Sequence, residues 1–95
     1  MVFGFRLRQA RERMGISQEA LATNAGIDEF SASARISQYE TGKHMPRYEI
    51  ACRLADVLEV PVAFLYARDS GTAQMLLLWQ AAPIAAKQRA ITALE

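Results

Sequence analysis

Residues 16–46, ISQEALATNAGIDEFSASARISQYETGKHMP, predict two short helices joined by a tight turn. Ser17 is a good N-cap for a helix that begins at Gln18, because its hydroxyl can accept a hydrogen bond from an amide of the first turn. Gly26 lies just past the last turn of that helix, where glycine readily adopts the left-handed conformation and lets a second helix approach closely. The segment therefore predicts a helix, a turn at Gly26 and a second helix.

Two different starts fit the second helix, which is expected to end at Thr41. In the first, the helix begins a turn early with Asp28 as its N-cap. In the second, residues 28–31 form a small loop, and Ser31 or Ser33 caps the helix. Asp and Ser are both favoured N-caps, so the residues alone leave the two starts open.

The second helix has an apolar inner side and a lean polar outer side when it is projected at 100° per residue. The inner side carries Ala32, Ile36, Tyr39 and Glu40, and the outer side carries Ser31, Ala34, Gln38 and Thr41, flanked by Arg35 and Ser37. A helix with small outer residues can enter a DNA major groove about 12 Å wide, where Arg35 and Gln38 reach base edges and Ala34 meets a thymine methyl. The alternative is an ordinary, weakly hydrophobic surface helix. Phe30 is interpreted as a core residue in preference to a wedge between base steps.

Three strings carry a family resemblance: GISQEALA at 15–22, AGI at 25–27, and ISQYETGK at 36–43 with a proline three residues later. In this order they resemble the helix-turn-helix of the phage repressor and Cro family, also called the Xre family, over residues 4–67. The resemblance implies an all-α fold in which a five-helix domain places its third helix in the major groove. The segment before Ile36 is longer here than in typical members, which leaves open which residues touch bases.

The resemblance also implies roles for individual residues. Gln18 is expected to hold a phosphate, and Arg11 and Glu40 are expected to form an ion pair that ties the first helix to the third. The predicted base contacts are Ser33, Ala34, Arg35 and Gln38. The predicted phosphate contacts are Gln18, Ser37, Thr41, Lys43 and Arg47. Arg47 lies at the start of the next helix, where plain solvent exposure is an equal alternative to a phosphate contact.

The composition of the 95 residues fits a small regulator better than other classes. Eleven basic and ten acidic residues give a net charge of +1, which argues mildly against strong nucleic-acid binding by a single copy. The chain has no export signal and no apolar run long enough to span a bilayer, so we expect a cytoplasmic protein without membrane contacts. The single Cys52 suits packing, and the single His44 is read as an exposed bystander.

After Pro46 the pattern predicts a helix over residues 47–59, a restart at Pro61, and two further helices over residues 72–82 and 83–95. Residues 75–79, MLLLW, are apolar around more than one side, so one packed face cannot cover them. We therefore expect a DNA-binding domain at residues 1–69 and a helical hairpin at 70–95 that forms a homodimer. The predicted interface residues are Met75, Leu78, Trp79, Ile84 and Ile91. The alternative is a hairpin folded back on its own domain.

The resulting hypothesis is a transcriptional regulator, most simply a repressor, that binds double-stranded DNA at a palindromic operator. No phosphate loop, metal-ligand set or catalytic pair occurs, so we expect no enzyme activity, no cofactor, no metal and no small-molecule ligand. The alternative function is an antitoxin-like or adaptor module whose helices at residues 72–95 bind a partner protein.

Overall fold

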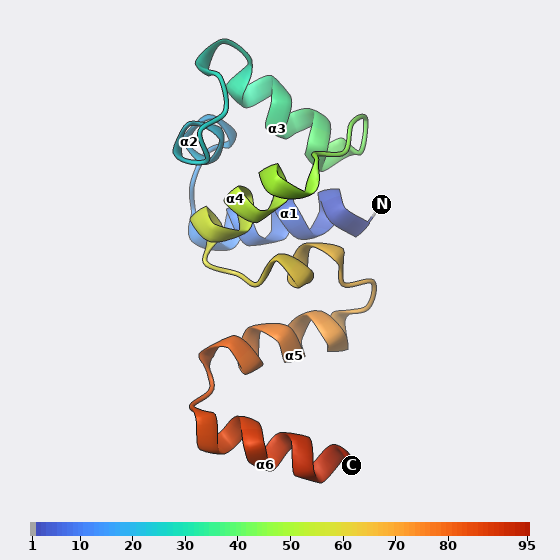
Figure 1. The fold of residues 1–95 in the computed structure, drawn as a ribbon. Coiled ribbons are helices and arrows are strands. Elements are labelled where there is room, and N and C mark those ends of the chain that lie inside the picture. The colour runs from blue at the N-terminus through green and yellow to red at the C-terminus, as the bar shows by residue number, and fades with distance from the viewer. Residues whose placement is uncertain (1) are drawn as a thin grey trace.

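The computed structural model describes residues 2–95, and this part of the chain contains helices and no strands (Figure 1). The α-helices are α1 (Val2–Met14), α2 (Gln18–Asn24), α3 (Ala32–Thr41), α4 (Tyr48–Leu58), α5 (Ser70–Ala81) and α6 (Ile84–Leu94). Two short 3-10 helices, η1 (Glu29–Ser31) and η2 (Val62–Tyr66), precede α3 and follow α4. The predicted all-α, repressor-like fold is confirmed, with η2 in the position of the expected fifth helix.

The start of α2 and the turn after it have the predicted geometry. Ser17 Oγ accepts a hydrogen bond from the Ala20 amide at 2.9 Å, which satisfies one of the free amides of the first turn. Gly26 has a φ of +80°, and the Ile27 amide donates to the Ala22 carbonyl at 2.9 Å. The chain therefore leaves α2 through a hydrogen-bonded left-handed turn.

The region before α3 follows the second of the two predicted starts. Asp28 Oδ1 accepts a hydrogen bond from the Phe30 amide at 3.2 Å, and η1 occupies Glu29–Ser31. Ser31 is the N-cap position of α3, although its side chain makes no capping hydrogen bond. The longer segment is thus absorbed by one 3-10 turn, and α3 begins at Ala32.

The prediction that Phe30 belongs to the core is wrong. Its side chain is fully exposed, at a relative accessibility of 101%. Ile27 packs against the core from the residues before η1, and Ala32 is buried directly after it. The core contacts on either side of the turn are thus made by Ile27 and Ala32, and the Phe30 ring lies in solvent.

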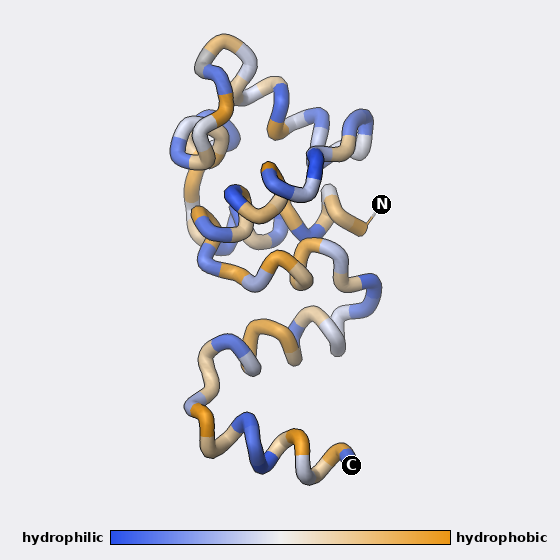
Figure 2. Tube along the Cα trace, viewed as in Figure 1, coloured by the Kyte–Doolittle hydropathy of each residue, from blue (hydrophilic) through white to orange (hydrophobic). Residues whose placement is uncertain are grey.

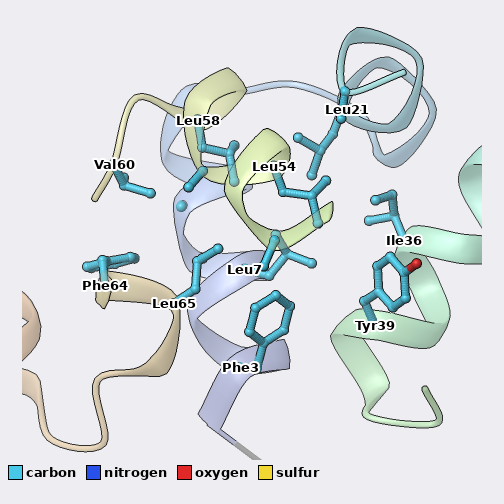
Figure 3. Close-up of a cluster of buried hydrophobic side chains, with 14 of the residues drawn as sticks. Phe3, Leu7, Leu21, Ile36, Tyr39, Leu54, Leu58, Val60, Phe64 and Leu65 are labelled. Atoms are coloured by element: carbon cyan, nitrogen blue, oxygen red, sulfur yellow. The ribbon is translucent and has the colours of Figure 1, made fainter. Parts of the chain in front are cut away.

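One hydrophobic core joins the first four α-helices and η2 (Figure 3). Leu7 and Leu54 lie at its centre, between the side chains of α3 on one side and those of η2 on the other. The largest fully buried side chains are Phe64, Leu7, Leu21, Ile36, Leu54, Leu58 and Leu65. Pro61 precedes η2 as its N-cap instead of occupying its first position. This core fixes α3 relative to the rest of the domain.

The last two helices differ in how much they contact the core (Figures 1 and 2). α5 packs on η2, with Ala73 buried and Leu76 and Leu77 partly buried against the core. α6 has no buried residue and lies beyond α5, at the end of a molecule that measures 48 × 23 × 23 Å. Lys87 Nζ lies 5.7 Å from the centre of the Trp79 ring and links the two helices. Within residues 2–95, no helix is both long enough and apolar enough to cross a bilayer.

Candidate nucleic-acid interface

The two sides of α3 have the polarity that was predicted. Ala32, Ile36 and Tyr39 are buried against the core. On the opposite side Ser33, Ala34 and Arg35 are exposed, and Gln38 is half-buried. Because the exposed side chains at its N-terminal end are small, the backbone of α3 can approach another surface closely, with Arg35 and Gln38 as the polar groups that reach furthest.

An ion pair holds the C-terminal part of α3 against α1. Arg11 Nε lies 2.6 Å from Glu40 Oε2, and Arg11 Nη2 donates to Glu40 Oε1 at 3.2 Å. The two side chains are only 14% and 5% exposed. Arg11 Nη1 also donates to the Ile16 carbonyl at 3.0 Å, so one guanidinium connects α1, the loop before α2, and α3. The hydrogen bonds to Glu40 raise the pKa of Arg11, which keeps it charged.

Gln18 contacts α3 through both ends of its side-chain amide. Its Nε2 donates to Glu40 Oε1 at 3.2 Å, and its Oε1 accepts from Ser33 Oγ at 3.5 Å. The first residue of α2 therefore lies against α3, between Ser33 in its first turn and Glu40 near its end. Its side chain is engaged within the protein in this structure, and the expected phosphate contact stays a prediction.

A close contact between α1 and α3, which was not predicted from the sequence, also positions α3. Gly4 is buried in α1 against the main chain of α3. A Cβ atom at this position would overlap the carbonyl oxygen of Glu40 and would lie 2.7 Å from that of Tyr39. A glycine inside a helix costs about 1 kcal/mol relative to alanine, so its presence there was a signal of a tight packing site.

The other predicted phosphate contacts surround the C-terminal end of α3. Thr41 Oγ1 donates to the Ser37 carbonyl at 2.9 Å, so this hydroxyl is bonded inside the helix, and Ser37 is half-buried. Lys43 and Arg47 are exposed on the loop after α3, and Arg47 Nη1 lies 3.9 Å from Glu49 Oε1. The loop begins at Gly42, whose φ of +78° ends α3 and turns the chain.

A hollow beside α3 is lined both by residues of the helix and by residues of the loop that follows it. Its volume is about 360 Å³, and it is lined by Arg35, Gln38, Tyr39, His44 and Met45. The His44 amide donates to the Gln38 carbonyl at 3.3 Å, which holds the loop against the helix. His44 therefore lies next to two of the predicted base-contacting residues. The sequence did not predict this contact, because the left-handed turn at Gly42, which folds His44 back toward Gln38, lies between the two residues.

The five residues assigned to a dimer interface lie on α5 and α6, away from α3. Met75, Leu78, Trp79, Ile84 and Ile91 are all exposed. Leu94, which was not assigned, is also exposed at the end of α6. The exposed apolar residues of α5 and α6 thus lie at the opposite end of the molecule from α3 (Figure 1).

Comparison with known proteins adds a family and two solved structures. The model of the family described as "Helix-turn-helix domain" matches residues 2–64. The crystal structure of the transcriptional regulator BswR is 40% identical, with a TM-score of 0.87 over 96% of this chain and 90% of that chain. The crystal structure of the P22 c2 repressor in complex with the synthetic operator 9T is 28% identical, with a TM-score of 0.61 over 68% of this chain and 92% of the repressor. No curated protein matches the chain.

The two structural matches cover different shares of the chain. The likeness to the P22 c2 repressor covers about the length of the helix-turn-helix part, whereas the likeness to BswR covers nearly the whole chain, including its last two helices. The predicted resemblance to the phage repressors is confirmed, and the chain belongs to the helix-turn-helix family.

Proposed function

We propose that the protein regulates transcription by binding double-stranded DNA in a sequence-specific manner. One observation carries the proposal: α3 exposes a lean polar side, while its inner side is fixed by Gly4, by the core, and by the ion pair of Arg11 and Glu40. A rigid helix with small side chains on its outer face fits the major groove. The family and the structural relatives, one of them a repressor bound to an operator, support the same function.

In the proposed complex, α3 lies in the major groove and its exposed residues contact base edges. Arg35 and Gln38 supply hydrogen bonds, Ser33 supplies a hydroxyl, and Ala34 supplies an apolar contact. Lys43 and Arg47 approach the phosphates on one side, and the start of α2 at Gln18 approaches them on the other. The phosphate contacts fix the register of the protein, and the base contacts select the sequence.

The proposal includes a homodimer that forms through residues 70–95, with residues 1–69 as the DNA-binding part. The exposed apolar residues of α5 and α6 form a surface that a second copy can cover about a twofold axis. Two copies place two α3 helices about 34 Å apart on one side of a near-palindromic operator. A net charge of only +1 per chain makes this second copy important, because each copy adds its own phosphate contacts. Such a protein acts in the cytoplasm, most simply by occupying the operator and repressing transcription.

Selection of bound duplexes from a random pool tests the proposal. The full chain should enrich a near-palindromic consensus whose half-sites are about 10 base pairs apart. The matched control is Ala34→Glu, which adds a carboxylate to the exposed side of α3 without changing its buried side, and which should enrich nothing. If the unaltered protein enriched no consensus sequence, sequence-specific binding would be contradicted.

A second candidate function rests on the exposed ends of the C-terminal helices. Ile84 and Leu94 on α6 are 73% and 81% exposed, and no residue of α6 is buried. These residues suit an antitoxin-like or adaptor role in which a partner protein covers α6. Sedimentation equilibrium and a DNA titration together separate the two candidates. A tight homodimer would favour self-association through these helices. A monomer that binds DNA weakly would favour a partner protein.

A further inference from the structure

The most exposed large hydrophobic residue of the described chain, Phe30, lies directly before α3. Two hydrogen bonds to Asp28 hold the backbone of this turn. The Phe30 amide donates to Asp28 Oδ1 at 3.2 Å, and the Ser31 amide donates to the Asp28 carbonyl at 3.2 Å. The ring is therefore presented to solvent by a hydrogen-bonded 3-10 turn, and it fills no space in the protein's own core.

The turn η1 lies at the N-terminal end of α3, the helix that is proposed to enter the major groove. It packs on both α2 and α3, and it is followed at once by the exposed Ser33 and Ala34. In the view of Figure 1, the turn before α3 rises above the helix on the side away from α1. The N-terminal residues of a recognition helix are the ones that contact base edges. An exposed side chain on this turn is therefore close in the chain to the residues that are proposed to contact bases.

The chemistry of the turn favours a base edge over the DNA backbone. A phenyl ring offers no hydrogen-bond donor to a phosphate, and the acidic Asp28 beside it would be repelled there. The major groove presents one prominent apolar group, which is the C5-methyl of thymine. An apolar side chain at the end of a recognition helix is complementary to that methyl.

We propose that Phe30 contacts the C5-methyl of a thymine in each half-site, next to the bases that Ser33 and Ala34 approach. The inference rests on the proposed sequence-specific DNA binding and extends it to a residue in the lengthened segment before α3. It gives that segment a role: the 3-10 turn supplies a larger apolar contact than the single methyl group of Ala34 in α3.

The experiment compares operators that differ only by this methyl group. An operator obtained by selection is synthesised with uracil in place of each thymine in turn, which removes the C5-methyl and leaves base pairing intact. For the unaltered protein, replacement of the thymine that Phe30 contacts should weaken binding about fourfold, which corresponds to the loss of one buried methyl group. A thymine that Ala34 contacts should be a separate sensitive position, and its sensitivity should persist in Phe30→Ala. The Phe30→Ala variant should bind the thymine operator roughly tenfold more weakly, and it should bind the thymine and uracil forms of the position that Phe30 contacts within about twofold of each other.

Two controls keep the result specific. Phe5→Ala removes another exposed phenyl ring, from the solvent side of α1, and should leave operator affinity unchanged. Phe30→Leu keeps an apolar side chain and should retain most of the preference for thymine. The melting temperature of Phe30→Ala should equal that of the unaltered protein, since the ring is fully exposed, so misfolding cannot explain a loss of affinity.

Three outcomes would overturn the assignment: equal operator affinity for Phe30→Ala and the unaltered protein, an equal loss on operator and random DNA, or the same set of methyl-sensitive thymines in Phe30→Ala as in the unaltered protein. Each of these leaves the proposed function intact if the selection yields a consensus. A selection without any consensus would remove the proposed function and the role of Phe30 together.

Discussion

Gly4 of α1 lies against the main chain of Glu40 in α3, with no space for a side chain between them. The same Glu40 receives Arg11 of α1 and Gln18 of α2 through its carboxylate. Helix α1 thus contacts both the main chain and the side chain of Glu40, and α2 contacts its side chain. This double contact fixes the rotation of α3 about its axis, which decides the residues that face outward.

Gly4→Ala should destabilise the protein by about 3 kcal/mol, the upper end of the cost of overpacking a core, because the added methyl group meets main-chain atoms that cannot rotate away. Urea unfolding followed by circular dichroism measures the change. The matched control is Gly71→Ala in α5, where the added Cβ meets only the carboxylate of Asp69 at 3.2 Å. The control should change stability by less than about 1 kcal/mol, since alanine favours the helix. Equal effects at the two positions would contradict a tight contact at Gly4.

Glu40→Ala should cost about 3 to 5 kcal/mol, because it leaves the mostly buried Arg11 charged and without its partner. Replacing both partners, as Arg11→Met with Glu40→Leu, should recover part of this loss. The control is the exposed pair of Arg8 and Glu12, whose side chains are 64% and 56% exposed, and where Glu12→Ala should cost no more than about 0.5 kcal/mol. The three variants are compared by chemical unfolding, and a cost for Glu40→Ala as small as that for Glu12→Ala would show that the pair does not hold α3.

Gln38→Ala and Lys43→Ala should affect DNA binding in different ways. Loss of the Gln38 amide should weaken binding to the selected operator by about 1 to 3 kcal/mol and leave random DNA unaffected, because this side chain is proposed to read a base. Loss of Lys43 should weaken both, and it should lower the slope of log K against log salt by about one per site. Fluorescence anisotropy titrations at several salt concentrations measure both quantities. An equal loss on operator and random DNA for Gln38→Ala would remove this residue from base recognition.

Leu78→Glu should convert the proposed homodimer into a folded monomer and lower its affinity for the operator. Leu78 is exposed on α5, so the added charge disturbs no buried contact of the single chain, but it would have to be desolvated in the interface. Analytical ultracentrifugation gives the mass, and circular dichroism verifies the fold. Gln88→Glu adds a charge to α6 without removing an apolar side chain and should stay dimeric. A Leu78→Glu variant that remains a dimer would place the interface elsewhere.

The sequence predicted those parts of the fold that local pattern determines. The N-cap at Ser17, the left-handed Gly26 and the buried face of α3 follow from side-chain chemistry and helical periodicity, and the structure confirms them. The burial of Phe30 was predicted wrongly, because hydrophobicity alone does not reveal which side of the short turn before α3 faces the core, where Ile27 and Ala32 make the contacts. Contacts between main chains, such as that of Gly4 with Glu40, leave no periodic signal and depend on how two distant helices cross.

Acid should loosen the start of α5, which connects the DNA-binding part to the proposed dimer surface. Hydrogen bonds from the Thr72 amide and hydroxyl, both at 2.8 Å, lower the pKa of Asp69 below its ordinary 3.8. The ionised cap therefore stabilises the folded state at neutral pH, and this contribution disappears as the pH falls from about 3.8 through the lower pKa of the folded protein. Amide hydrogen exchange of the first turn of α5 should be faster in Asp69→Ala than in the unaltered protein at pH 6, with Asp69→Asn in between because asparagine still caps a helix. Titration of the Asp69 carboxyl by NMR gives its pKa directly, and a value at or above 3.8 would contradict the capping role.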